Sequence, residues 1–406
     1  MNLADMLCYA DIAELTAIAE TYECTCSSHS KNELIQSILS TVQRRDVLES
    51  RVGEMTAADL RFLNSLLFES RVTYSLEELK ARALGGESVN SPFNAGKPQA
   101  AAPVAPTPPA KGSRSRKGKN GPPSAPVAPE DIARHAISRF KKFGWLFNGF
   151  SQQTRYLYQV PEDVRTRLSD ALEKRYRTML DERDEPPAYR DEGTLLVGDM
   201  TQLLRFVRDN DLQITSEGVL YKRQIGQIIE RLAVNETVPT RGGWRFGYGR
   251  HFRDYPDRMS FLYDYAYYHK LIEERTDRLT ITEAGRDVAD GTSRLEPPDL
   301  YRFWLRLYKG PIPNVTTLVQ WITRLSAEWV SIESLYAILQ PLVRSYYYDT
   351  SRDVFERRIL TMLMHLGMIK WGETAGGEGV VRTTTQGKAL VKGVSSPLED
   401  KIILNP

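Results

Sequence analysis

The sequence predicts a mainly α-helical protein with small β wings: a small N-terminal helical domain, a disordered linker and a larger C-terminal region. Three observations carry this prediction. Apolar residues recur at helical spacing in residues 1–85, a proline-rich stretch covers 86–129, and a pattern of helix, two short strands and helix occurs twice after residue 260. The predicted domains are residues 1–85, 86–129, 130–297 and 298–406.

Composition places the chain among ordinary soluble globular proteins. Of its 406 residues, 41% are hydrophobic and 26% are charged, and the net charge is +2. This balance excludes a fibrous protein and one held to nucleic acid by bulk charge. The sequence contains no apolar run of the roughly 18–20 residues that a bilayer span needs. The first residues lack the basic cluster of a secretory signal, and three cysteines make no disulfide framework, so we expect a cytoplasmic protein without membrane contact.

The N-terminal part, residues 1–85, carries the signatures of several short helices. Ile12, Leu15 and Ile18 lie on one face at helical spacing. Ser30 is a candidate N-cap, and Glu33 three residues later completes a capping box before an apolar stripe. Thr56 and Ser75 open two further helices, each with a capping side chain.

The start of the helix predicted after Ser30 is similar to a known module. Its sequence Ser30-Lys31-Asn32-Glu33-Leu34-Ile35 resembles the SAP or HeH type of helix–extended–helix DNA-binding module, over about 30 residues. The resemblance implies that Lys31 lies at a DNA-contacting position. The usual glycine before this lysine is missing. A plain helical protein-docking domain is the alternative interpretation.

Two cysteines and a histidine lie close together at Cys24, Cys26 and His29. A structural zinc site needs four ligands, most often with two to four residues between paired cysteines. Here one residue separates the cysteines, and Cys8 lies in the first predicted helix. We therefore predict no metal.

The stretch 86–129 has the composition of a linker. It holds 10 of the 22 prolines and too little apolar side chain to form a core. Six basic residues against Glu87 alone give it a charge of +5, which leaves −3 for the rest of the chain. It is either a solvated spacer or a flexible arm that contacts phosphates.

The most informative feature is the repeat in residues 261–291 and 359–393. Each copy reads as an apolar helix, a strand, a polar turn, a second strand and the sequence Thr-x-x-Gly-basic at the start of a closing helix, with Thr282 and Thr384 as N-caps. The glycine-rich turn 374–379 suits a tight hairpin. Helix, hairpin and returning helix form the wing end of a winged-helix domain, so we predict tandem winged-helix units.

Most of residues 130–393 resembles a known family. The segments 144–147, 158–165, 203–225 and 328–335 and the repeat follow one another as in bacterial helicase-associated proteins with an XPB-type accessory domain. Those proteins join winged-helix units and lack the helicase motor. The resemblance implies DNA-related work beside a helicase or nuclease and names no reaction for this chain.

Several basic residues are candidates for DNA contact, because in a winged helix the helix before the wing enters the major groove. They are Arg352, Arg357 and Arg358 before the second hairpin, Arg382 and Lys388 near it, and Lys222 and Arg223 just after an earlier predicted strand and turn. Asp353 and Glu356 alternate with the first group, so a solvated, salt-bridged helix face is the alternative there. For Lys222 and Arg223 the alternative is a structural ion pair.

The stretch 241–253 has the most unusual local composition, with four arginines and four aromatic residues among glycines. Its candidates are Arg241, Trp244, Arg245 and Arg250. Aromatic rings and arginines together suit stacking of bases and neutralisation of phosphates in single-stranded nucleic acid. The alternative is that these rings fill a core beneath a glycine-rich hairpin.

Catalytic motifs are missing from the sequence. It has no phosphate-binding Gly-x4-Gly-Lys-Ser/Thr loop, no His-Glu-x-x-His and no Gly-x-Ser-x-Gly. We therefore predict a non-enzymatic protein without cofactors that binds DNA through its winged-helix units as an accessory to a helicase or nuclease. The alternatives are an interaction scaffold whose winged helices bind protein, and a transcriptional regulator. A DNA reader gathers its arginines on one face, whereas a scaffold shows mixed charge and exposed apolar residues.

Overall fold

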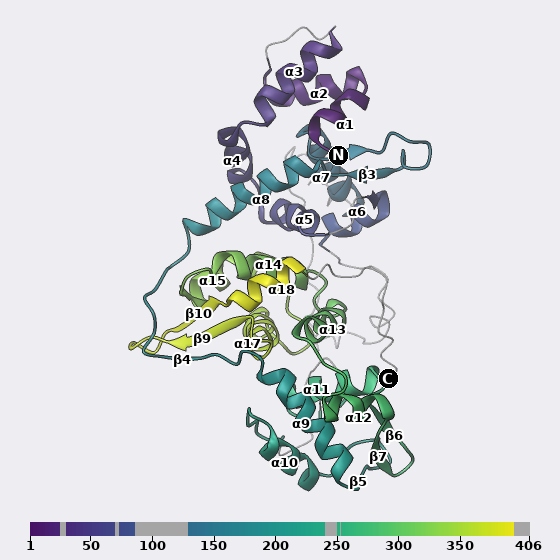
Figure 1. Cartoon of the computed structure of the whole chain (residues 1–406). Helices are drawn as coiled ribbons and strands as arrows, with labels where there is room; N and C mark the ends of the chain where they lie inside the picture. The colour runs from purple at the N-terminus through teal and green to yellow at the C-terminus, as the bar shows by residue number, and fades with distance from the viewer. Residues whose placement is uncertain (25–29, 70–72, 86–128, 240–249, 252, 394–406) are drawn as a thin grey trace, which may run out of the picture. The chain divides into compact units, whose positions relative to one another are not determined.

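The computed structural model describes residues 1–24, 30–69, 73–85, 129–239, 250, 251 and 253–393. The described chain is mainly helical with three small antiparallel sheets (Figure 1), which confirms the predicted class. The linker 86–128 lies outside the described residues, as do Cys26, His29, Arg241, Trp244 and Arg245.

The chain forms two compact units. Unit 1 comprises Met1–Val42, Ala58–Phe62 and Thr73–Glu162, and unit 2 comprises Gln43–Ala57, Leu63–Val72 and Asp163–Pro406. These limits differ from the predicted boundaries after residues 85 and 129. Residues 129–162 belong with the N-terminal helices because strand β1 (Tyr74–Ser75) pairs with β3 (Leu157–Gln159), and α6 (Leu76–Ala83) packs against α7 (Pro129–Lys142).

Unit 1 is a helical layer with one small sheet. Leu15, Ile18, Leu34 and Ile38 are buried as the helical spacing predicts. The Ser75 hydroxyl accepts a hydrogen bond from the backbone of Glu78 and so caps α6. The sheet order is β1-β3-β2. The remaining elements of the unit are α1 (Leu3–Tyr9), α2 (Ile12–Thr21), α3 (Lys31–Val42), β2 (Phe147–Asn148) and part of α5 (Ala57–Leu67).

Unit 2 contains both copies of the predicted repeat. Each copy is preceded by a helix, a strand and a further helix in the same order, and we call these longer stretches the first and second repeats. The first repeat comprises α9 (Leu195–Asp209), β5 (Leu212–Gln213), α10 (Lys222–Arg231), α11 (Asp257–Tyr268), β6 (Ile272–Glu274), β7 (Arg278–Ile281) and α12 (Glu283–Asp290). The second comprises α14 (Val315–Leu325), β8 (Val330–Ser331), α15 (Ile332–Leu339), η1 (Gln340–Leu342), α16 (Ser351–Asp353), the π-helical η2 (Val354–Leu360), α17 (Thr361–His365), β9 (Ile369–Glu373), β10 (Gly379–Thr383) and α18 (Thr385–Gly393).

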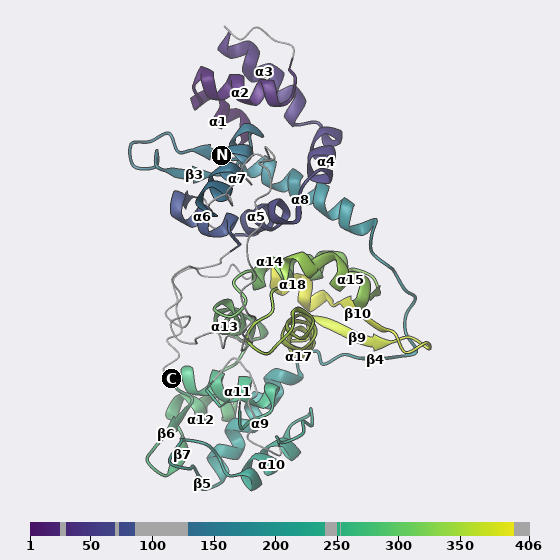
Figure 2. The ribbon, with the colours of Figure 1, turned by 180° about the vertical axis from the view of Figure 1, so that it is seen from behind.

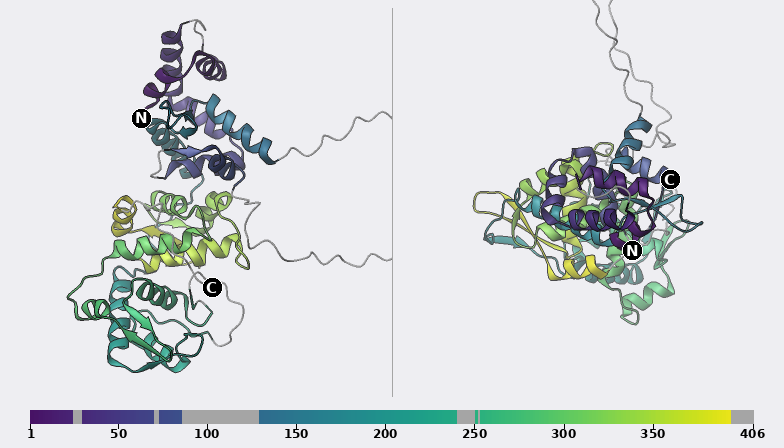
Figure 3. Two further views of the ribbon diagram at one scale, coloured as in Figure 1. Left: turned by 90° about the vertical axis from the view of Figure 1, so that its right-hand side faces the viewer. Right: turned by 90° about the horizontal axis from the view of Figure 1, so that it is seen from above.

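Strand pairing is also the same in the two repeats. In each, the strand after the first helix pairs antiparallel with the second strand of the hairpin: β5 with β7, and β8 with β10. Figure 2 shows the β6–β7 hairpin beside α12 from the side opposite to Figure 1. The helix α13 (Pro297–Lys309) joins the repeats along the chain and packs against both α11 and α18. In the left view of Figure 3 the yellow C-terminal helix lies against the green helices of this unit.

The Thr-x-x-Gly sequence has the same structural role in both repeats. The hydroxyls of Thr282 and Thr384 accept hydrogen bonds from the backbone N–H of Gly285 (3.1 Å) and Gly387 (2.9 Å). A Cβ atom on Gly285 would lie 2.0 Å from the carbonyl oxygen of Leu271, and one on Gly387 would lie 2.2 Å from the corresponding oxygen of Met368. The threonine therefore begins the closing helix, and the glycine lets this helix approach the start of the hairpin.

The sheet of the second repeat gains a strand from outside the repeat. Strand β4 (Ala188–Arg190) pairs antiparallel with β9, which gives the order β4-β9-β10-β8. Gly372 permits the close approach, since a Cβ there would lie 2.4 Å from Pro186 Cγ. Unit 2 also contains α4 (Arg45–Gly53) and most of α8 (Glu162–Arg177).

Candidate functional site

The helix before each hairpin is the element that would face DNA in the predicted arrangement, and in both repeats it is buried. In α11 every residue from Arg258 to Ala266 is buried. In the second repeat the residues from Met362 to His365 are buried, and so are five of the seven residues of η2. Solvent-exposed side chains on this second helix occur at its N-terminal end, at Arg352 and Arg357.

A buried ion pair joins the two helices. The Arg358 side chain is 4% exposed, and its Nε lies 2.8 Å from Asp349 Oδ2. Its Nη1 lies 3.4 Å from Oδ1 of Asp257, the first residue of α11. Burial alone would lower the pKa of Arg358, but the hydrogen bond that it donates to Asp349 and the charge of Asp257 raise that pKa above its ordinary value. Arg358 is therefore an internal tie between the repeats, and the prediction that it reaches DNA is corrected for this reason.

A second ionic cluster lies at the same junction. Glu192 Oε2 lies 2.9 Å from His365 Nδ1 of α17 and 3.4 Å from Arg258 Nε of α11. The guanidinium of Arg258 also pairs with Asp199 of α9. Burial favours a raised pKa for Glu192, but its hydrogen bond with His365 and the charges of Arg258 and Arg190 hold that pKa below its ordinary value. The carboxylate is thus charged and links both helices.

Arg250 is held by a carboxylate as well. Its Nη1 and Nη2 lie 3.1 and 2.9 Å from the two oxygens of Glu274, and its guanidinium lies 3.8 Å from the ring centroid of Tyr267. Tyr263 donates a hydrogen bond of 2.7 Å to the same Glu274. The pKa of Glu274 is held below its ordinary value because His251, Tyr263 and Arg250 outweigh the effect of burial. A guanidinium used in this way anchors the hairpin of the first repeat.

The neighbouring Asp264 is buried on α11 and differs from these carboxylates. Its Oδ1 accepts a hydrogen bond of 3.2 Å from the backbone N–H of Arg250, and its Oδ2 has no hydrogen-bond partner among the described residues. Burial raises its pKa to about 7. Asp264 is therefore a titratable group inside unit 2 near neutral pH.

The other predicted cations have varied environments. Arg352 pairs with Glu333 at 2.5 Å and Glu356 at 2.7 Å, the salt-bridged face that was the alternative interpretation. Arg382 pairs with Glu328 at 3.1 Å. Among the described cations predicted to contact DNA, the exposed ones are Arg352 and also Lys222, Arg223, Arg357 and Lys388. In unit 1, Lys31 donates a hydrogen bond of 2.8 Å to the carbonyl oxygen of Cys8.

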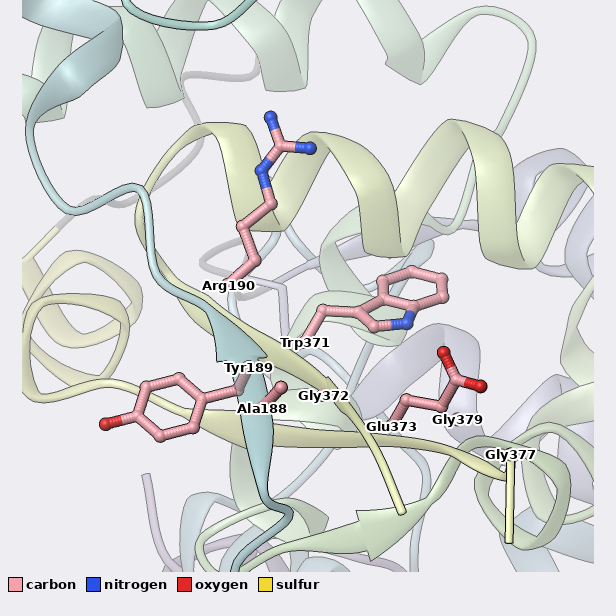
Figure 4. Close-up of a pocket in the computed structure, with 8 residues that line it drawn as sticks. All are labelled: Ala188, Tyr189, Arg190, Trp371, Gly372, Glu373, Gly377 and Gly379. Atoms are coloured by element: carbon pink, nitrogen blue, oxygen red, sulfur yellow. The ribbon is translucent and has the colours of Figure 1, made fainter. Parts of the chain in front are cut away.

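An open hollow of about 460 Å³ lies on the four-stranded sheet of the second repeat (Figure 4). Arg190 of β4 lies opposite Trp371 of β9 in the register of the sheet, and both line the hollow. Glu373 extends from the same side as Trp371. Arg190 pairs at 2.6 Å with the buried Glu192. The residues that line the hollow also include Tyr189, so it offers a phenol ring, an indole ring and one exposed carboxylate.

An exposed aromatic turn precedes η2 and was missed by the sequence reasoning. Tyr347 and Tyr348 are 63% and 66% exposed. Tyr347 has a φ of 50°, a left-handed conformation that is unfavourable for a bulky residue. The run of three tyrosines, residues 346–348, between polar residues was the available signal. By contrast, nothing in the sequence indicated that Glu192 and His365, 173 residues apart, would meet.

The described chain contains no group of three or more His, Cys, Asp and Glu side chains arranged to hold a metal ion. In the same ranges, no helix is both long and apolar enough to cross a lipid bilayer. Comparison with family models, curated proteins and solved structures gives no match to this chain. The resemblance to helicase-associated proteins thus stays a prediction.

Proposed function

We propose that the protein is a non-catalytic scaffold that works beside a DNA-processing enzyme such as a helicase or nuclease, and that its two repeats bind protein rather than the major groove of DNA. We infer winged-helix units from the element order and from the pairing of the first strand with the second hairpin strand. The observation that carries the proposal is the burial of the helix before each hairpin.

Burial matters because a groove-reading helix must present several side chains to base edges. On α11 the residues from Arg258 to Ala266 are buried, and Arg258 pairs with Glu192 and Asp199. Exposing this face to DNA would break charged pairs in the interior. Removal of one partner of such a buried pair lowers the free energy of unfolding by about 3–5 kcal/mol, so the cost of exposure is of this order. The two helices therefore serve to hold the repeats together.

The surface left to a partner includes the turn with Tyr347 and Tyr348. Tyrosine and arginine are enriched among the residues that dominate protein–protein binding energy, and the exposed Arg357 follows on η2. Charges near this turn are mixed, since Arg352 is shared by Glu333 and Glu356. Mixed charge with exposed rings favours a protein partner over a polyanion.

The first test measures binding of the full chain to duplex and forked DNA by fluorescence anisotropy over a salt series. The variant combines Lys222→Ala, Arg223→Ala, Arg352→Ala and Arg357→Ala. We expect it to bind duplex DNA within about twofold of the unaltered chain, with the same salt slope. A fall of tenfold or more, with a shallower salt slope, would assign these cations to phosphate contacts and overturn the proposal.

The second test asks what the tyrosine turn touches. A photo-cross-linking phenylalanine derivative replaces Tyr348 in the full chain in cells, and the matched control replaces Met179, which is 57% exposed. We expect a discrete protein adduct from position 348 alone, weakened by Tyr347→Ala. Nuclease-sensitive adducts at position 348 would contradict the proposal, as would equal adducts from both positions.

Nucleic-acid binding by the first repeat is the second candidate function. Tyr221 is 51% exposed, and Lys222 and Arg223 follow it in exposed positions at the N-terminal end of α10. A helix N-terminus with adjacent cations is favourable for phosphate. The anisotropy series distinguishes this candidate through Lys222→Ala with Arg223→Ala alone, a variant that must then lose duplex binding.

A further inference from the structure

Unit 1 exposes a group of aromatic rings that the proposed scaffold role does not use. Tyr9, at the end of α1, is 64% exposed, and Phe150, directly after β2 and Gly149, is 43% exposed. Their rings stack with centroids 4.4 Å apart and an interplanar angle of 18°. Tyr156, at the other end of the loop between β2 and β3, is 69% exposed, and the Arg155 guanidinium lies 4.5 Å from its ring centroid.

The loop that carries these rings is fixed by local hydrogen bonds. The backbone N–H of Thr154 donates to the Ser151 hydroxyl at 3.1 Å, and the two hydroxyls lie 2.7 Å apart. Asn148 Nδ2 donates to the carbonyl oxygen of Arg155 at 3.2 Å. Because the loop is already ordered, a ligand that stacks on it bears little cost of ordering. Figures 1 and 2 show this hairpin extending from the helices of its unit.

Three basic side chains lie near the rings, together with the acidic Asp11 and Glu14. Arg155 is the one ionisable side chain of the loop 149–155. Lys31 lies beside Tyr9, because its Nζ donates to the carbonyl oxygen of the preceding residue, Cys8. Lys141 Nζ donates to Asn148 at 2.8 Å and lies 3.4 Å from Glu14. The nearby Asp11 is turned onto the backbone of Glu14, which it caps.

We propose that Tyr9, Phe150 and the Arg155–Tyr156 pair form a stacking platform for the bases of single-stranded nucleic acid. Flat rings stack bases of any sequence, and flanking cations track the phosphates. A protein partner fits this loop less well, because residues 151–154 are serine, two glutamines and threonine, which offer a partner little aliphatic surface. The platform lies wholly within unit 1 and does not depend on the role of the repeats.

The test uses the full chain and a labelled 12-nucleotide oligothymidylate in fluorescence anisotropy near physiological salt. The variant Tyr9→Ala with Phe150→Ala should weaken binding roughly tenfold to hundredfold, because stacking of one base contributes that much. Tyr9→Phe retains the ring and should bind within about twofold of the unaltered chain. Tyr347→Ala with Tyr348→Ala removes two exposed rings from unit 2 and should leave the affinity unchanged.

A second ligand separates stacking from charge. An abasic oligomer of equal length carries the same phosphates without bases, so stacking predicts binding at least tenfold weaker than that of oligothymidylate. Equal affinity for the two oligomers would overturn the platform, as would an unchanged affinity in the double-alanine variant. No binding of oligothymidylate by the unaltered chain would also overturn it and would favour a protein ligand for these rings. Urea unfolding of each variant verifies that the fold is retained.

Discussion

The Nη1 atom of Arg358, a residue of η2, lies 3.4 Å from Oδ1 of Asp257, the first residue of α11. The helices before the two hairpins are thereby joined by a buried charge. His365 and Arg258, one on each helix, meet the same carboxylate of Glu192 and add a second link. In the predicted arrangement each repeat would present this helix to DNA. In the structure the two helices are instead linked to each other by these charged side chains.

Replacing Arg358 should destabilise the protein strongly. Arg358→Ala leaves Asp349 and Asp257 without their cation, and loss of one partner of a buried pair costs about 3–5 kcal/mol. The free energy of unfolding in urea measures this. The matched control is the neighbouring exposed Arg357, for which alanine should change stability by less than about 0.5 kcal/mol. Equal effects of the two substitutions would show that Arg358 is not an internal tie.

The glycines of the Thr-x-x-Gly sequence should not tolerate a methyl group. Gly285→Ala and Gly387→Ala each place a Cβ within 2.2 Å of a backbone carbonyl oxygen, so each should destabilise the fold by about 1–3 kcal/mol. A Cβ on Gly226 in α10 would meet no described atom within 4 Å beyond its chain neighbours and its own helix backbone. Gly226→Ala should therefore be neutral or stabilising by up to about 1 kcal/mol. Thermal unfolding of the three variants tests this contrast, which fails if Gly226→Ala is the most damaging.

Asp264 should give stability a distinctive dependence on pH. Burial raises its pKa from 3.8 to about 7, so between these values the folded protein holds a proton that the unfolded chain has released. Its contribution is fully present below about pH 4 and is lost as the pH rises through 7. One pKa unit corresponds to about 1.4 kcal/mol. The free energy of unfolding of Asp264→Asn, relative to that of the unaltered chain, should therefore rise by more than about 1 kcal/mol from pH 5 to pH 8.

The measurement for Asp264 is urea unfolding at both pH values. Asp211→Asn is the control, since Asp211 has a side chain that is 67% exposed and should show the same difference at pH 5 and pH 8. A difference for Asp264→Asn that stays constant, or that falls as the pH rises, would contradict a raised pKa at this position.

Glu192 should act in the opposite direction. Its pKa is held below the ordinary value, so its contribution to stability is present above the unfolded pKa near 4.5 and is lost as the pH falls through the folded pKa. Glu192→Gln should therefore lose more stability at pH 7 than at pH 3, measured again by urea unfolding. Loss that is independent of pH would indicate that packing, not charge, is what Glu192 contributes.

Local sequence patterns predicted the elements that depend on nearby residues. The capping threonines and their glycines, both hairpins and the helical stripe with Leu15 and Ile18 follow from spacing within about 20 residues. The cap geometry shows why the pattern was informative. The start of the closing helix depends on the threonine hydroxyl and on the absence of a Cβ atom at the glycine. These two residues are only three positions apart in the sequence.

Burial of charged residues could not be predicted in the same way. Arg357 and Arg358 are adjacent in sequence, yet one is exposed and the other has a side chain only 4% exposed. Arg358 pairs with Asp349, nine residues away, and with Asp257, which is 101 residues away. Similarly, β4 joins β9 across a long separation, and no periodicity in Ala188–Arg190 identifies its partner. Pairing over such distances is decided by tertiary packing.

Hydrogen exchange of the full chain, with and without forked duplex DNA, tests the central claim most directly. If α11 and α17 hold the repeats together, the amides of 258–268 and 361–365 should exchange only through large-scale unfolding, and added DNA should leave their protection unchanged. Rapid exchange of these amides in the free protein, followed by strong protection when duplex DNA is added, would show that the helices are available to the groove and would contradict the account.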